Sequence, residues 1–196
     1  MARVSKTFTS LFGAVLLVSV QATALFGRTS SFEPTVIAIH PTVDNSSCVT
    51  ASAHAVGAPI VIAPCAAEKV DLQYFISPTN PVFNFGGGHQ LAVGGATPTS
   101  PLLCIIPDNN AVQTYGTGLV LGECDLSGQT IDQIWAIGDS GSYISNANYG
   151  LSVFTLPGGN LTAGNQLQIT ENTRWVVGGN GVTAVNHWQT WTETYI

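Results

Sequence analysis

The clearest chemical signal in this 196-residue chain comes from four cysteines, Cys48, Cys65, Cys104 and Cys124. Cysteines at such spacings either bind a metal or pair as disulfides. The CxxC and HxxxH spacings typical of zinc sites are absent from the sequence, so neither a metal nor a cofactor is expected. Four cysteines allow three pairings, and sequential pairing closes the shortest loops. Each such loop would contribute about 3 kcal/mol in the loop-entropy model.

A serine and a histidine invite a test for nucleophilic catalysis. Gly138-Asp139-Ser140-Gly141 is similar to the serine motif of trypsin-like proteases, and His54 precedes it in the order that this family uses. However, Ala55 stands where the family has a cysteine, and Gly, Asp and Ser are also ordinary β-turn residues. No carboxylate pair falls in a catalytic motif. The sequence therefore predicts a protein that is not an enzyme.

Composition and charge narrow the class of protein. Charged residues make up 8% of the chain, against roughly 25% in an ordinary soluble protein. Residues 1–24 contain two basic residues, Arg3 and Lys6, followed by the apolar run Leu11–Val20 and by small residues suited to cleavage. This order is typical of a signal peptide, so secretion is expected. A membrane anchor is the alternative, but the run has about half the length that a span needs.

Removal of this segment leaves three cations against eleven acids, a net charge of −8. Nucleic acid and anionic membranes are then not expected as partners, because both are bound through clustered cations. Two N-glycosylation triplets, which begin at Asn45 and Asn160, fit an exported protein, so both asparagines are candidate glycosylation sites. A mature part of this length is enough for one domain.

Short strands are the elements expected to position these residues. Gly or Pro interrupts almost every window of ten residues, and no long stretch after the signal peptide keeps the 3.6-residue apolar period of a helix. The predicted strands are Pro59–Ala63, Tyr74–Ile76, Val82–Phe85, Gln90–Val93, Leu119–Gly122, Ile134–Ile137, Leu151–Phe154, Gln166–Thr170 and His187–Thr192. Many short, regularly spaced strands favour a sandwich or a barrel.

A recurring triplet favours the barrel. Gln73-Tyr74-Phe75 and Gln133-Ile134-Trp135 share a Gln-x-aromatic pattern, and Asn186-His187-Trp188 is a divergent third copy. A single unit cannot bury its own apolar face, whereas three aromatic side chains can meet near a threefold axis. Phe75, Trp135 and Trp188 are therefore predicted to lie in the core, in preference to a role in stacking on a ligand.

With these repeats the chain resembles the ricin B-type lectin family, the Gln-x-Trp β-trefoils common among fungal secreted proteins. The residues from Cys48 to Cys65 are similar to the family's pattern of cysteine, Gly-x-Pro, apolar run and Pro-Cys, and Gln73-Tyr74-Phe75 follows. The third repeat is also similar, although both of its cysteine positions are replaced. The second repeat has two possible registers, one opening at His89–Val93 and the other at Cys104.

The resemblance implies an all-β, disulfide-containing β-trefoil with three pseudo-repeats, at about residues 48–75, 90–135 and 150–188. The trefoil would span residues 48–196, preceded by an N-terminal extension and first strand at 25–47 and by the signal peptide at 1–24. The family uses each repeat to bind sugar through an aspartate after the first cysteine, an aromatic before the second and a polar group beside the triplet.

These sugar-binding positions have largely lost their residue types here. The aspartate position becomes Thr50, then Ala92 or Ile106, then Ser152; the aromatic position becomes Ala63, Gly122 and Thr170; and the position before the triplet becomes Leu72, Asp132 and Val185. A carboxylate and a ring are what a sugar's paired hydroxyls and apolar face need. Only Asp132 and Gln168 remain as polar candidates for carbohydrate binding.

The sequence therefore predicts a secreted, lectin-like carbohydrate-binding protein whose family sites are degenerate. Any surviving sugar site would use another surface, and the segments Thr97–Tyr115 and Asn160–Gln168 are the candidates. The alternative is a non-enzymatic β-trefoil that binds a protein partner, such as a protease inhibitor, through exposed loops on a rigid barrel.

Overall fold

The computed structural model describes residues 35–77, 88–94, 101–110, 114–125, 127, 130–137, 143–146, 152–171, 175–177, 183–185 and 187–196. All of them fall in one unit of the chain, Phe32–Ile196. The expected signal peptide, the predicted strand Val82–Phe85 and the Gly138–Gly141 motif lie outside the described residues.

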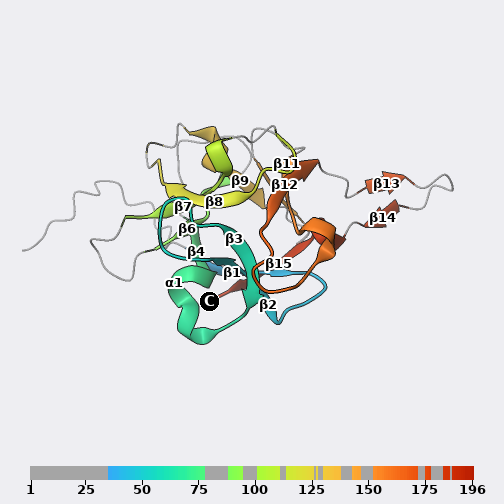
Figure 1. The fold of residues 1–196 in the computed structure, drawn as a ribbon, viewed down its shortest axis with the longest axis horizontal. Helices are drawn as coiled ribbons and strands as arrows, with labels where there is room; N and C mark the ends of the chain where they lie inside the picture. The colour runs from blue at the N-terminus through green and yellow to red at the C-terminus, as the bar shows by residue number, and fades with distance from the viewer. Residues whose placement is uncertain are drawn as a thin grey trace, which may run out of the picture. The chain divides into compact units, whose positions relative to one another are not determined.

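Short strands make up most of the described chain, as expected (Figure 1). They are β1 (Thr35–Pro41), β2 (Ser47–Ala51), β3 (Ile60–Pro64), β4 (Tyr74–Ser77), β5 (Gly88–His89), β6 (Ala92–Val93), β7 (Leu103–Pro107), β8 (Leu119–Glu123), β9 (Trp135–Ile137), β10 (Ile144–Asn146), β11 (Ser152–Thr155), β12 (Gln168–Glu171), β13 (Trp175–Val177), β14 (Thr183–Val185) and β15 (Trp191–Tyr195). The helical elements are single turns: α1 (Val70–Gln73), η1 (Ala67–Lys69), η2 (Asp108–Asn110), η3 (Ile131–Gln133), η4 (Pro157–Gly159) and η5 (His187–Gln189). No helix among the described residues is long and apolar enough to cross a membrane.

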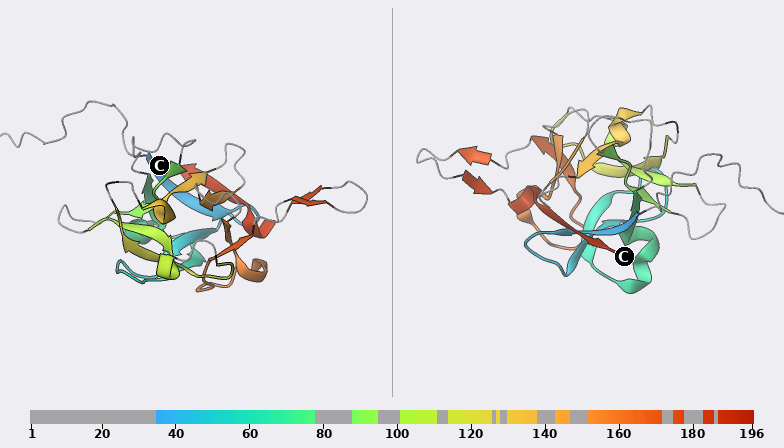
Figure 2. Two further views of the ribbon diagram at one scale, coloured as in Figure 1. Left: turned by 90° about the horizontal axis from the view of Figure 1, so that it is seen from above. Right: turned by 180° about the vertical axis from the view of Figure 1, so that it is seen from behind.

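All strand pairs are antiparallel. One sheet has the order β15-β1-β4-β6-β7-β8 and another the order β12-β11-β10-β9-β5, while β2 pairs with β3 and β13 with β14. β1 lies between β4 and β15, so strands from the two ends of the described chain are neighbours; the view from behind in Figure 2 shows the blue and red strands together.

Most predicted strands are confirmed to within two residues. The clearest are those that became β3, β4, β8, β9, β11 and β12. The prediction for Gln90–Val93 is only partly right, because β5 ends at His89 and β6 begins at Ala92. The strand predicted over His187–Thr192 is wrong at its start, since η5 occupies His187–Gln189 and β15 begins at Trp191.

Three hairpins close into a ring. We call them hairpin 1 (β2–β3), hairpin 2 (β7–β8) and hairpin 3 (β11–β12), and they share one register in which Cys48 faces Ala63, Cys104 faces Gly122 and Val153 faces Thr170. Isolated bridges join hairpin 1 to hairpin 2 at Pro59 and Val120, hairpin 2 to hairpin 3 at Gly118 and Gln168, and hairpin 3 to hairpin 1 at Gln166 and Val61. Backbone atoms alone therefore connect the three hairpins cyclically.

A glycine with positive φ begins each junction of this ring. The φ angles are 80° at Gly57, 86° at Gly116 and 90° at Gly164. Each glycine N–H donates to the next hairpin: Gly57 to the carbonyl of Leu121 at 2.7 Å, Gly116 to that of Ile169 at 2.7 Å, and Gly164 to that of Ile62 at 2.8 Å. Glycine is required here because a Cβ is disfavoured at positive φ.

Replacing Gly116 by alanine should lower the free energy of unfolding by about 1–2 kcal/mol through backbone strain alone. An added Cβ would meet no atom within 4 Å, so no clash contributes. Urea unfolding followed by tryptophan fluorescence measures the change. Tyr115→Ala, at the exposed neighbouring residue, is the control and should be nearly neutral; a neutral Gly116→Ala would show that the turn does not need positive φ.

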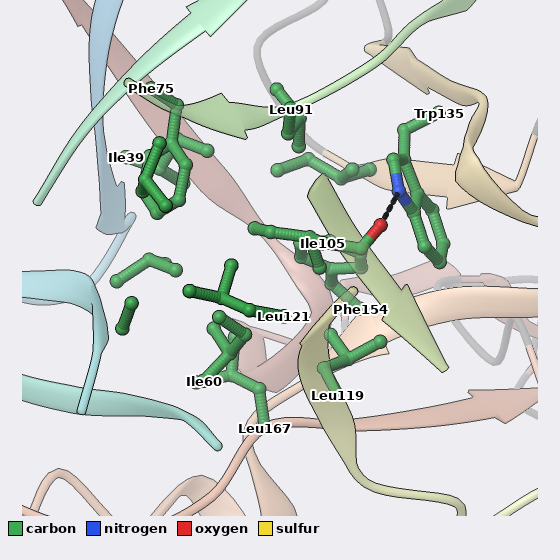
Figure 3. Packing of buried hydrophobic residues seen from close by; sticks show 14 of the residues in the cluster. Ile39, Ile60, Phe75, Leu91, Ile105, Leu119, Leu121, Trp135, Phe154 and Leu167 are labelled. Carbon is green, nitrogen blue, oxygen red and sulfur yellow. Dashed lines mark hydrogen bonds between the residues drawn. The ribbon is translucent and has the colours of Figure 1, made fainter. Parts of the chain in front are cut away.

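The core fills the ring and the sheets with apolar side chains (Figure 3). Trp135 is fully buried, lies edge-on to Phe154 with ring centroids 4.6 Å apart, and donates its indole N–H to the carbonyl of Ile105 at 2.9 Å. Phe75 is also fully buried, which confirms two of the three aromatic predictions.

The third aromatic prediction is wrong. Trp188 is 50% exposed, whereas Trp191 is only 2% exposed and donates its indole N–H to the carbonyl of Phe154 at 3.2 Å. Phe154 and Ile105 occupy the same place in their hairpins, so Trp191 is the counterpart of Trp135. The third triplet is Gln189-Thr190-Trp191, and the choice of Asn186-His187-Trp188 was three residues too early.

The glutamine of each triplet anchors its own hairpin. Gln73, Gln133 and Gln189 are all buried. Their side-chain N–H groups each donate to the carbonyl of the last residue of β3, β8 or β12: Gln73 to Pro64 at 2.9 Å, Gln133 to Glu123 at 2.7 Å and Gln189 to Glu171 at 2.7 Å. Buried amides of this kind fix a hairpin end against the core, because leaving them unpaired would be costly.

Candidate functional site

Both predicted sequential disulfides are present. Cys48 pairs with Cys65 and Cys104 with Cys124, and no cysteine is free. Cys104 lies in β7 opposite Gly122, so the second repeat follows the Cys104 register. His89 and Ala92 instead belong to the short strands β5 and β6, which pair with β9 and with β4 and β7.

The shared register identifies the residues at the aspartate position of each hairpin. Two residues after Cys48, Cys104 and Val153 come Thr50, Ile106 and Thr155. The assignment of this position to Ser152 in the third repeat is therefore wrong, because Ser152 faces Glu171 and lies one residue before the counterpart of the cysteines. None of the three residues is acidic.

Their side chains are already engaged within the fold. Thr50 Oγ1 donates to the carbonyl of Cys48 at 3.0 Å and accepts from Gln73 Nε2 at 3.1 Å. Thr155 Oγ1 lies 2.6 Å from Thr170 Oγ1 and accepts from Gln189 Nε2 at 3.2 Å. In hairpin 2, Ile106 packs so closely over Gly122 that a Cβ on the glycine would overlap its side chain.

Asp132 and Gln168, the two predicted sugar-binding residues, belong to different hairpins. Asp132 lies in η3, immediately before Gln133. The side chain of Gln133 is hydrogen-bonded to the Glu123 carbonyl at the end of β8. Burial raises the pKa of the Asp132 carboxyl. Gln168 faces Thr155 across hairpin 3 and bridges to Gly118, beside the opposite end of β8. Gly118 and Glu123 are five residues apart in extended chain, which spans about 16 Å, so the two side chains are placed at separate locations.

The carboxylate of Asp125 is hydrogen-bonded within its own turn. Asp125 accepts from the hydroxyl and backbone N–H of Ser127 and from those of Thr130. These hydrogen bonds, that of the Ser127 hydroxyl above all, hold the pKa of Asp125 far below its usual range. The Asp125 N–H in turn donates to Gln133 Oε1 at 2.7 Å. Asp125 therefore orients the buried triplet glutamine through its own turn.

A polar face on hairpin 3 was not predicted as a unit. Directly opposed residues of two strands, and residues two apart on one strand, share a face, so Thr155, Gln168 and Thr170 lie on one side of the hairpin. Gln189 Nε2 donates to Thr170 Oγ1 at 2.8 Å as well as to Thr155, and brings η5 against the same face. We call these residues, together with Trp188, the hairpin 3 face.

Trp188 lies at the rim of this face. Its carbonyl accepts from the Leu156 N–H at 2.9 Å, and its indole edge packs against the backbone of Gly159, where a Cβ would overlap the ring. Gly159 has a φ of 64°, which suits it to this close approach. The sequence signal that was overlooked is the complete Gln-Thr-Trp triplet at Gln189, which places Trp188 outside the core.

The two glycosylation candidates are exposed. Asn160 Oδ1 accepts from the Thr162 N–H at 3.0 Å, and Asn160 follows the η4 turn on which Trp188 packs. Asn45 lies in the turn between β1 and β2 and follows Asp44. Hydrogen bonds from Ser46 and Ser47 lower the pKa of the Asp44 carboxyl.

The histidines differ in their surroundings. His54 Nε2 and His89 Nδ1 are buried without a hydrogen-bond partner in the described part of the chain, and burial lowers the pKa of His89. His40 is different: its Nδ1 lies 3.1 Å from the carbonyl oxygen of Ser47, 3.6 Å from Cys48 Sγ and 3.5 Å from Cys65 Sγ.

No protein-family model matches the sequence, and no curated protein matches it either. Solved structures do match. The β-trefoil lectin of the Vibrio vulnificus hemolysin/cytolysin, with N-acetyl-D-lactosamine bound, aligns with 84% of this chain and 96% of its own at a TM-score of 0.50 and 14% identity. The chain has the β-trefoil fold.

Two further solved structures are similar to the chain. The C-half of the earthworm R-type lectin, in complex with GalNAc, has 11% identity and a TM-score of 0.55 over 83% of this chain and all of its own. A mosquitocidal holotoxin has 14% identity and a TM-score of 0.61 over 84% of this chain, which spans only 18% of the holotoxin chain. At these identities the likeness establishes the fold alone.

Proposed function

We propose that this β-trefoil is a secreted, lectin-like, non-enzymatic protein that binds carbohydrate at the hairpin 3 face. The observation that carries the proposal is the half-exposed indole of Trp188, which packs on the turn of hairpin 3, the hairpin whose polar face carries the partly exposed side chains of Gln168 and Thr170. An aromatic ring covers the apolar face of a sugar, and amides and hydroxyls bond its hydroxyl groups. Two of the similar structures are lectins.

The support from Trp188 is geometric. Packing of its indole edge on Gly159 restricts the side chain, so little rotamer entropy remains to be lost when a ligand stacks on it. The side chain of Glu171 is exposed next to Thr170, and its carbonyl accepts from Gln189. A carboxylate at this rim would add a charge-assisted acceptor for paired sugar hydroxyls.

The three hairpins and triplets fit a trefoil of three pseudo-repeats, the last of which we extend to Trp191. In this arrangement Leu72, Asp132 and Trp188 are the residues that precede the three buried glutamines. Asp132 therefore offers hairpin 2 a second, separate candidate site. Export is proposed from residues 1–24, the two disulfides and the exposed glycosylation triplets at Asn45 and Asn160.

A glycan array probed with the secreted protein tests the function. Trp188→Ala and Gln168→Ala should each weaken specific binding by at least about tenfold, the loss expected for a stacking or hydrogen-bonding contact of about 1.4 kcal/mol. Tyr195→Ala, which removes an exposed aromatic outside hairpin 3 and outside both candidate segments, is the matched control and should bind as the parent does.

The Asp132→Ala variant separates the two candidate locations. Retained binding in this variant, with loss in Trp188→Ala, assigns the sugar to hairpin 3; the reverse pattern assigns it to hairpin 2. Binding that survives all three substitutions would contradict both locations, and an array without any specific signal would contradict the lectin function.

A protein partner is the second candidate function, and the exposed apolar side chains at two ring junctions favour it. Val56 is 63% exposed and Tyr115 is 49% exposed, and each directly precedes a junction glycine. Such side chains on rigid turns are suited to anchoring in a partner's pocket. A Val56→Ser, Tyr115→Ser double variant that loses capture of a protein partner but keeps its stability would support this function.

A further inference from the structure

We infer that reduction of the Cys48–Cys65 disulfide would create a metal site for a thiolate-binding divalent cation such as Zn²⁺, with His40 as the third ligand. His40 Nδ1 and the two sulfurs lie within 4.8 Å of one another, although Cys48 follows His40 by 8 residues and Cys65 follows it by 25. No metal-binding spacing predicts this site, because His40 belongs to β1 and the cysteines flank hairpin 1.

The distances match tetrahedral coordination. A tetrahedral zinc ion with Zn–S near 2.3 Å and Zn–N near 2.0–2.1 Å places the nitrogen and each sulfur about 3.6 Å apart. His40 Nδ1 already lies 3.6 Å from Cys48 Sγ and 3.5 Å from Cys65 Sγ. The distances from Nδ1 to the two sulfurs therefore already suit a metal site, while the sulfurs need to separate to about 3.8 Å by the same geometry and Nδ1 needs to exchange its contact with the Ser47 carbonyl for the ion.

The backbone fixes two ligands and leaves the third room to move. His40 lies in β1, paired with Thr192 of β15, and Cys48 lies in β2 with only 1% of its surface exposed. Cys65 follows the last residue of β3 and is exposed, so its side chain can rotate outward once the S–S bond is broken. Water would occupy the fourth position, as in zinc sites with three protein ligands.

The chemistry balances with an external dithiol as reductant. The dithiol donates two electrons and two protons, the S–S bond breaks, two thiols form, and the dithiol becomes a cyclic disulfide. Metal binding then releases both thiol protons to solvent. The neutral imidazole carries its proton on Nε2, so that Nδ1 can bind the ion and gives up its hydrogen bond to the Ser47 carbonyl.

Cobalt(II) is the probe, because thiolate ligands give it charge-transfer bands in the near ultraviolet. The full-length secreted protein is reduced with dithiothreitol, freed of reductant without air, and titrated with Co²⁺ and then with Zn²⁺. One equivalent of Co²⁺ should produce the bands, and Zn²⁺ should displace it. His40→Ala should weaken Co²⁺ binding at least about tenfold, in line with losses for metal-site residues.

Two controls keep the outcome decisive. A Cys104→Ala, Cys124→Ala variant retains the proposed site and should still give the bands, whereas a Cys48→Ser, Cys65→Ser variant should not. Circular dichroism follows folding throughout. Unchanged Co²⁺ affinity in His40→Ala, no bands from the Cys104→Ala, Cys124→Ala variant despite its two titrated thiols, or equal bands in urea would each overturn the proposal. Failure here leaves the glycan-binding proposal untouched, since that function does not involve His40.

Discussion

Replacing Trp191 by alanine is expected to lower the free energy of unfolding by about 3–5 kcal/mol. The side chain is 2% exposed, and its loss removes both core packing and the indole hydrogen bond to the Phe154 carbonyl. Trp188→Ala, three residues earlier, should cost less than about 1 kcal/mol, because half of that ring already faces water.

Urea unfolding of the two variants, followed by far-ultraviolet circular dichroism, measures both changes. The pair is matched, since each variant loses one tryptophan from the same short segment of chain. A larger loss in Trp188→Ala than in Trp191→Ala would contradict the assignment of Gln189-Thr190-Trp191 as the third core triplet.

Removal of the Cys104–Cys124 disulfide by a double substitution with alanine should lower the free energy of unfolding by about 3 kcal/mol or more. The bridge closes a separation of 20 residues, for which the loop-entropy model gives about 3 kcal/mol. Cys104 is fully buried, so its truncation adds a small packing loss. This bridge ties the two strands of hairpin 2 at the register pair of Cys104 and Gly122.

Thermal and urea unfolding of the double variant, compared with the parent protein under non-reducing conditions, provide the measurement. Hairpin 3 has the same register without a disulfide, so the variant should keep its fold at low temperature. A change below about 1 kcal/mol would mean that the unfolded chain is already compact around hairpin 2, and that the bridge constrains little.

Local pattern was enough to predict the strand-rich class and most strand positions. Gly-rich turns and alternating apolar runs depend only on residues that are close in sequence, so they can be recognised without the structure. The register of hairpin 1 follows from its cysteines and its apolar run. The strand at Leu103–Pro107 was missed because it lay within the segment interpreted as an excursion, Thr97–Tyr115. Sequence pattern alone cannot decide whether the second repeat opens at His89 or at Cys104. The pairing of β7 with β8 decides for Cys104.

The hairpin 3 face and the His40 cluster depend on contacts between distant segments. Gln189 reaches Thr155 across 34 residues, and His40 reaches Cys65 across 25. Trp188 ends a divergent triplet, whereas the complete Gln-Thr-Trp copy lies three residues later. An aromatic residue in a divergent motif does not by itself reveal whether it faces the core or water.

The pairing of β1 with β15 has a consequence for the order of assembly. Ile37 pairs with Tyr195 and Pro41 with Trp191, so β1 meets this partner only after every other described strand has been synthesised. Hairpins 1, 2 and 3 need only local contacts and can form as the chain emerges, but contacts of long sequence separation form slowly. During biosynthesis the nascent chain therefore carries one open edge of β1 until β15 has been synthesised, and an open strand edge can pair with another chain.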